Sequence, residues 1–143
     1  MASITDASAT NPYLVVIGPR VYTVTSPIVM TPYVDIAGSG ENVTKITGAI
    51  STAAAETSAI VLGANNATLS SLNVENTGGG NVSIALYNYY ASPMVKNVVV
   101  KASGGGSSYG IRNHHSSPTL IGVTATGSGQ INRSLPPGID EQF

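Results

Sequence analysis

Short hydrophobic runs separated by turn residues make up the first half of the chain. Each run is rich in β-branched residues and ends at glycine or proline, and none keeps the 3.6-residue period of an amphipathic helix. The alanine-rich residues 51–56 favour only a helical turn, which is too short to be stable alone. The pattern therefore predicts short β-strands at residues 13–17, 21–25, 28–30, 34–36 and 43–46.

From residue 58 onward, one pattern of apolar and turn residues repeats with a period of about 25 residues. Residues 83–106 align with residues 108–129, and residues 58–80 fit the same frame with slightly fewer turn residues. The aligned positions are Ser83 with Ser108, Leu86 with Ile111, Asn88 with Asn113, Ser92-Pro93 with Ser117-Pro118, and Leu69, Leu72 and Val74 with Val95, Val98 and Val100 and then with Leu120, Val123 and Ala125. Several copies of one unit predict an array of stacked units.

The repeat predicts an all-β fold, a right-handed parallel β-helix (a solenoid) of about five coils. One unit cannot bury its apolar side chains alone, so stacked copies must form apolar columns. We predict one domain over residues 1–143, in which residues 1–12 are a lead-in, 13–57 the N-terminal coils, 58–129 three repeats and 130–143 a capping tail. A β-sandwich is the alternative, whereas a leucine-rich repeat is excluded because its asparagine-centred leucine pattern is missing.

Composition and charge exclude several classes of function. Charged residues make up 9% of the chain, and the net charge is −1 without a basic cluster, so we predict no nucleic-acid partner. Cysteine is absent, which excludes disulfides and thiolate chemistry. No apolar run reaches the roughly 20 residues of a membrane span, and Met1 begins no recognisable signal peptide. We therefore predict no membrane partner and leave the localisation unknown.

The N-terminal coils carry a motif that goes beyond periodicity. A strand is followed by a proline-x-x-tyrosine step, an apolar strand, a glycine-x-glycine turn and a threonine-x-isoleucine-x-glycine segment. The residues that form it are Pro19, Arg20, Val21 and Tyr22, then Val34, Ile36, Gly38 and Gly40, then Thr44, Ile46 and Gly48. This segment resembles the opening coils of pectin-lyase-like right-handed parallel β-helix proteins, the pectinesterase-like members above all. The resemblance implies relatives that are secreted or displayed on the cell surface.

The catalytic residues of these enzymes have no counterparts in the chain. The pectinesterase resemblance implies a glutamine and two aspartates on one strand face, yet all such residues lie outside the middle coils: Asp6, Asp35, Asp140, Gln130 and Gln142. The paired aspartates of polygalacturonases and the calcium-binding carboxylates of pectate lyases are also missing. The amphipathic helix that plugs the N-terminal end in the family is absent before Ile4. We therefore predict no catalytic residues and no cofactor, and an enzyme remains the alternative.

One group of residues stands out as a candidate binding site. Residues 87–90 read Tyr-Asn-Tyr-Tyr, and residues 112–115, one period later, read Arg-Asn-His-His. The register places Tyr87 beside Arg112, Tyr89 beside His114 and Tyr90 beside His115. These six side chains would form either a platform for stacking sugar rings, with Arg112 and the histidines as hydrogen-bonding groups, or a packed column that closes the corner. Asn88 over Asn113 predicts a short asparagine ladder.

A metal site is not predicted. Adjacent residues of a strand point to opposite sides, so His114 and His115 are expected to diverge, and no carboxylate is close in the sequence. Zinc needs three or four converging protein ligands. We expect Glu75, at a polar strand end, to be a solvated side chain.

The two ends of the predicted solenoid differ. Residues 130–143 break the repeat with Pro136-Pro137, and we predict that they fold over the last coil as a cap or dock on a neighbouring chain. The N-terminal end has no comparable plug. We therefore expect self-association there, as a homodimer or an end-to-end oligomer, and we consider a polysaccharide as the other partner.

Overall fold

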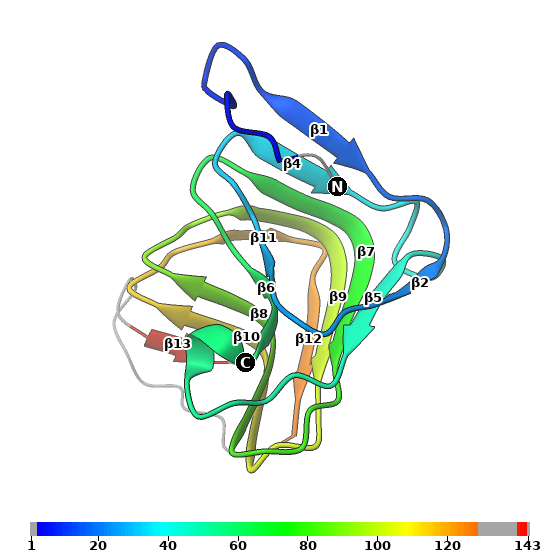
Figure 1. Cartoon of the computed structure of the whole chain (residues 1–143), viewed down its shortest axis with the longest axis vertical. Coiled ribbons are helices and arrows are strands. Elements are labelled where there is room, and N and C mark those ends of the chain that lie inside the picture. The colour runs from blue at the N-terminus through cyan, green and yellow to red at the C-terminus, as the bar shows by residue number, and fades with distance from the viewer. Residues whose placement is uncertain (1–2, 129–139, 143) are drawn as a thin grey trace.

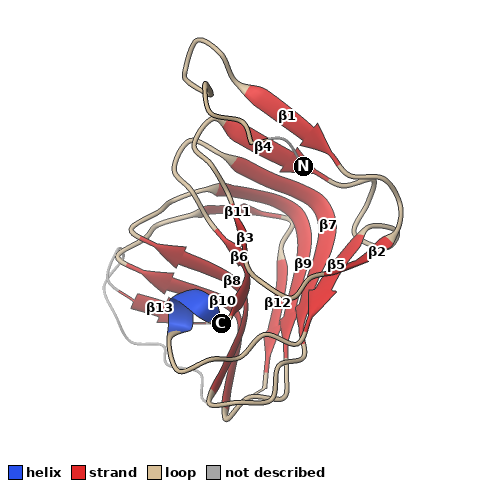
Figure 2. Cartoon of the chain, viewed as in Figure 1, coloured by secondary structure: helices blue, strands red, loops and turns tan. Residues whose placement is uncertain are grey.

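The computed structural model describes residues 3–128 and 140–142 and shows a parallel β-solenoid with one helical turn (Figures 1 and 2). The single turn of 3-10 helix, η1, covers Ala55–Thr57, and no helix in the described residues is long and apolar enough to span a membrane. The strands are β1 Tyr13–Val16, β2 Val21–Thr23, β3 Ile28–Val29, β4 Val34–Ala37, β5 Lys45–Gly48, β6 Ala59–Leu62, β7 Thr68–Asn76, β8 Val82–Tyr89, β9 Met94–Ala102, β10 Ser107–His114, β11 Thr119–Ile121, β12 Thr124–Gly127 and β13 Asp140–Gln142.

The strands form three faces. Face 1 contains β1, β4, the first parts of β7 and β9, and β11; face 2 contains β2, β5, the second parts of β7 and β9, and β12. Face 3 contains β3, β6, β8, β10 and β13. All pairs are parallel except β10 with β13, so each coil lies directly on the previous one. Parallel pairing between successive coils confirms the predicted solenoid and excludes the β-sandwich.

The bend between faces 1 and 2 occurs inside continuous strands. β7 and β9 are continuous nine-residue strands that run through this bend. Each strand turns at one residue with left-handed backbone, Ser71 (φ 56°) in β7 and Asn97 (φ 53°) in β9, and Gly122 (φ 59°) occupies the same corner between β11 and β12. A single left-handed residue redirects the strand without a loop.

The core consists of columns of aliphatic side chains that cross the coils. Leu86 pairs with Ile111 and Leu72 with Val98, as the repeat predicted, and all four are fully buried. Burial of one such side chain contributes roughly 1.5–3 kcal/mol, so the stacked columns supply much of the favourable energy of folding. Removing one coil therefore removes the partners of two others.

One buried polar side chain joins several coil segments. Asn76, at the end of β7, has two hydrogens on Nδ2 that are shared among the carbonyl oxygens of Ile50 (2.8 Å), Ser58 (2.9 Å) and Ile84 (2.9 Å). Its Oδ1 accepts from the backbone N–H groups of Ile50 and Gly78, both at 3.0 Å. The side chain thereby satisfies backbone groups that the neighbouring strands leave unpaired.

The predicted capping tail lies mostly outside the described residues. Residues 129–139 and 143 are not described, and these include Pro136-Pro137 and the apolar residues of the tail. Residues 140–142 form β13, which runs antiparallel to β10 with Asp140 opposite His114. This strand covers the edge of face 3 at the C-terminal end.

Candidate functional site

The predicted register brings four rings together at the corner that follows face 3. Tyr89 and His114 are partners in β8 and β10, and their rings stack with centroids 5.1 Å apart and planes 16° apart. Tyr90 and His115 stack in the same way, at 4.7 Å and 18°. We call Tyr89, Tyr90, His114 and His115 the ring cluster. In each stack, a ring of one coil lies on a ring of the next coil, and the two stacks are neighbours.

Left-handed backbone at two residues aligns the stacks. Tyr90 (φ 49°) and His115 (φ 48°) leave the strand conformation, so their rings do not turn to the opposite side from Tyr89 and His114. The His114 and His115 rings are 4.4 Å apart and nearly perpendicular, as are the Tyr89 and Tyr90 rings at 4.7 Å. The prediction that the two histidines point to opposite sides was therefore wrong, because it assumed regular strand alternation up to His115.

Side-chain hydrogen bonds hold this corner in place. Asn65 Oδ1 accepts from the backbone N–H of Ser92 at 2.8 Å, and Asn65 Nδ2 donates to the carbonyl of Tyr90 at 3.3 Å. One coil later, Ser116 Oγ accepts from the N–H of Ala91 at 3.1 Å and donates to the carbonyl of His114 at 2.8 Å. The ring cluster is therefore carried on a fixed backbone rather than on a free loop.

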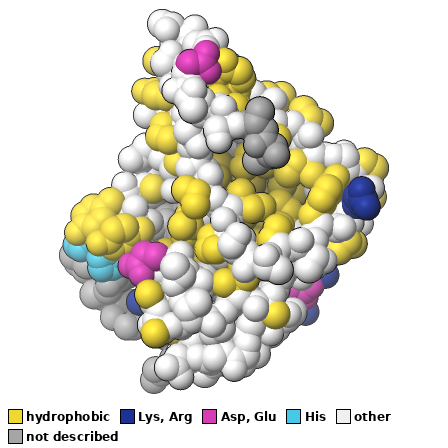
Figure 3. Space-filling model, in the orientation of Figure 1, with side chains coloured by type: hydrophobic (Ala, Val, Ile, Leu, Met, Phe, Trp, Pro, Cys, Tyr) yellow, Lys and Arg dark blue, Asp and Glu magenta, His cyan; other side chains and the backbone are white. Residues whose placement is uncertain are grey.

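The two tyrosine side chains of the ring cluster are about half exposed to the solvent. Tyr89 and Tyr90 are 48% and 58% exposed, but each has one ring face against an imidazole. The polar groups of these side chains are phenol hydroxyls and imidazole nitrogens, which form hydrogen bonds. Figure 3 shows the two histidines together at the edge of a hydrophobic group on the left of the view.

Tyr87 and Arg112 are placed differently from the ring cluster. Tyr87 is 3% exposed and belongs to a small apolar cluster with Ala59, Ile84 and Tyr109, separate from the main core. The Arg112 guanidinium lies 5.8 Å from the Tyr87 ring centroid and 5.5 Å from that of Tyr109. The six predicted residues thus divide into an exposed ring cluster and a cation–π contact that packs face 3.

The asparagine pair lies buried beneath the ring cluster. Asn88 Nδ2 donates to Asn113 Oδ1 at 2.8 Å, in the register that the repeat predicted. A Cβ atom at Gly63, in the preceding coil, would lie 2.0 Å from Asn88 Oδ1, so only glycine leaves space for this amide. The two asparagines connect successive coils inside the solenoid.

Glu75 is held between two lysines on face 2. Its carboxylate forms an ion pair with Lys45, and its Oε1 lies 3.7 Å from Lys101 Nζ. The side chain is only 17% exposed, so the prediction of a solvated side chain was wrong; lysines from the neighbouring strands β5 and β9 shield it. The hydrogen bond from Lys45, aided by the charge of Lys101, holds the pKa of Glu75 below its usual value, against an opposing effect of burial.

The lowered pKa of Glu75 predicts a pH-dependent stability. The folded-state pKa is below the unfolded one, so the ion pairs stabilise the fold above the unfolded pKa and lose this effect as the pH falls through the folded pKa. We expect Glu75→Gln to lower the free energy of unfolding by roughly 0.5–1 kcal/mol at pH 7. Urea unfolding should show this difference shrinking in acid and in high salt, whereas Glu56→Gln, at an exposed position, should have no effect. A difference that persists in acid would contradict the ion-pair account.

Potential metal ligands are dispersed. Within residues 3–128, no three histidine or carboxylate side chains lie close enough together to hold a metal ion. Nothing in the sequence pattern marks Asn76, whose side chain bonds to backbone groups of several coil segments.

Comparisons with known proteins show similarity in fold. No family model matches the chain, and no curated protein matches it in sequence. Two solved structures are similar: a pectin methylesterase in complex with a hexasaccharide (TM-score 0.55, 15% identity, 69% of this chain and 36% of that one) and pectin methylesterase PemA from Erwinia chrysanthemi (TM-score 0.54, 14% identity, 82% and 42%). This chain has the parallel β-helix fold of pectin methylesterases. It spans less than half the length of either enzyme.

Proposed function

We propose that this chain is a non-catalytic β-solenoid scaffold that presents the ring cluster at a fixed corner. The proposal rests on the ion pairs and hydrogen bonds that three carboxylates form within the fold. Glu75 is paired with two lysines on face 2, and Asp35 Oδ1 accepts from the Thr68 backbone N–H at 2.7 Å on face 1. Asp6 accepts from the Tyr13 hydroxyl at 2.8 Å in the lead-in. These three acids stabilise separate parts of the solenoid, whereas catalysis by a pair of carboxylates needs both groups at one bond.

Polysaccharide binding at the ring cluster is the second candidate function. Two half-exposed phenols and the exposed imidazole of His115 provide polar groups beside apolar ring surface, which suits the mixed polarity of a sugar. One of the fold neighbours was solved with a hexasaccharide. The fixed backbone of the corner lowers the entropy cost of binding.

One experiment separates these functions. The chain is incubated with pectin and with polygalacturonate, release of methanol and uronate is assayed, and binding is measured by calorimetry. We expect no turnover; turnover would overturn the scaffold proposal. If the ring cluster binds the polysaccharide, Tyr90→Ala and His115→Ala should weaken binding at least tenfold, and Thr126→Ala, at an exposed position on face 2, should not. Absence of binding, or binding unchanged in both ring variants, would overturn the second candidate.

A further inference from the structure

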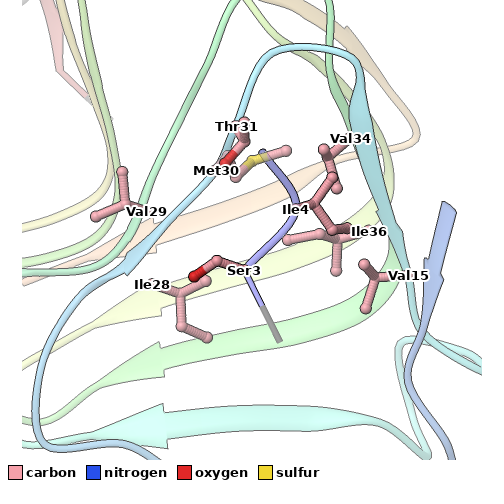
Figure 4. Close-up of a pocket in the computed structure, with 9 residues that line it drawn as sticks. All are labelled: Ser3, Ile4, Val15, Ile28, Val29, Met30, Thr31, Val34 and Ile36. Carbon is pink, nitrogen blue, oxygen red and sulfur yellow. The ribbon is translucent and has the colours of Figure 1, made fainter. Parts of the chain in front are cut away.

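The solenoid interior opens into an apolar hollow at its N-terminal end. One lobe, of about 380 Å³, lies between the three faces and is lined by aliphatic side chains with Tyr22 and Gly18. A second lobe, of about 350 Å³, shares Val15, Ile28 and Ile36 with the first. Figure 4 shows Ile4 of the lead-in entering this second lobe, and Figure 3 shows the hydrophobic lining from outside. No charged residue lines either lobe.

The strands around the hollow are edge strands. Within the described residues, β1 pairs only with β4, β2 only with β5 and β3 only with β6. The N–H groups of Tyr13 and Ile17 bond to the second coil, so those of Leu14 and Val16 point to the open edge, as alternation along a strand requires. Leu14 and Val16 are also 62% and 70% exposed. Edge strands with apolar side chains attract other strands.

The edge of another β-structure fits both the apolar hollow and the unpaired edge strands around it. A small apolar molecule would fill the hollow but leave the backbone groups of three edge strands unpaired, whereas an edge strand supplies hydrogen bonds as well as apolar surface. A second copy of this chain presents the same outline and the same uncharged lining, so the two linings would meet without repulsion between like charges.

The opposite end of the solenoid determines how two copies can meet. A head-to-tail stack would continue all three faces in parallel from one copy to the next. On face 3, however, β13 already occupies the C-terminal edge and runs antiparallel to β10. Association through two N-terminal ends needs no such displacement, pairs edge strands antiparallel and closes after two copies.

We infer that two copies of this chain associate through their N-terminal ends, about a two-fold axis, with β1 and its neighbours as the contact. This inference is independent of the ring cluster, which lies at a corner of the third and fourth coils and stays accessible in such a dimer. Failure of one proposal would therefore leave the other unchanged. The dimer would close the hollow and protect the three edges from non-specific pairing.

Sedimentation velocity over a range of concentrations tests the inference. The chain should sediment as a species with twice the monomer mass of 14.5 kDa. Leu14→Pro removes a free-edge N–H and an exposed apolar side chain without removing a hydrogen bond to the second coil, and Val16→Lys places like charges at the contact, so both should shift the species to monomer. Thr124→Lys, on β12 at the other end, should leave the dimer intact.

Four results would overturn the inference. One is a wild-type monomer at the highest soluble concentration, and another is a monomer that retains an apolar small molecule in native mass spectrometry. The third is mass that keeps increasing beyond the dimer, which would indicate head-to-tail stacking. The fourth is a dimer that Leu14→Pro and Val16→Lys leave intact although circular dichroism shows both variants folded.

Discussion

Replacement of Asn76 by aspartate should lower the free energy of unfolding by at least about 3 kcal/mol, because it places an unpaired charge in the interior. The Nδ2 atom of Asn76 faces the carbonyl oxygens of Ile50, Ser58 and Ile84, and a carboxylate oxygen there would be repelled by all three. The residue is fully buried, so water cannot compensate. Protonation would restore one donor only.

Urea unfolding of matched variants tests this expectation. Asn76→Ala should also destabilise, by roughly 3 kcal/mol, since it leaves several buried backbone groups without partners. Asn81→Asp, at an exposed position just before β8, introduces the same charge and should change stability by less than about 0.5 kcal/mol. Equal stabilities of the Asn76 and Asn81 variants would show that the amide does not join the coils.

The repeat was sufficient to predict the fold because the spacing of its apolar residues shows which residues of successive coils pair. Leu69 pairs with Val95 and Val74 with Val100, the columns that the alignment of repeats predicted. Such columns need only hydrophobic residues of similar size at a constant spacing. Periodicity therefore reveals them without knowledge of the corners.

Features that occur once in the array could not be predicted in this way. Asn76 lies between Gly48 and Ala102 in adjacent coils, so no column of asparagines marks it. The bends at Ser71 and Asn97 use residue types that do not require left-handed backbone. Tertiary packing determines both features.

The ring cluster was predicted in its membership but not in its geometry. The register placed Tyr89 beside His114, and the structure pairs them. Regular alternation, however, predicted that adjacent rings diverge, and left-handed backbone at Tyr90 and His115 prevents this. Tyr87 was included because the alignment of repeats cannot show the second apolar cluster that buries it.

A chain shortened by one full period should fold. Residues 86–110 make up one period, because their number equals the 25-residue spacing between Asn88 and Asn113. Their removal joins Ala85 to Ile111. Ile111 then occupies the buried position of Leu86, and Asn113 that of Asn88. The fold loses one coil, and one new interface between the flanking coils replaces the two that this coil formed, so the shortened chain should unfold cooperatively but at lower urea concentration.

A chain shortened by one residue fewer should not fold. Removing residues 87–110 keeps Leu86 and shifts every later residue of the strand to the opposite side. Arg112 would then take the buried position of Asn88, where nothing pairs its charge.

Urea unfolding of these two shortened chains, measured side by side, tests the stacked-coil account most directly. The account predicts a cooperative transition for the chain without residues 86–110 and none for the chain without residues 87–110. Equal behaviour of the two chains would contradict it.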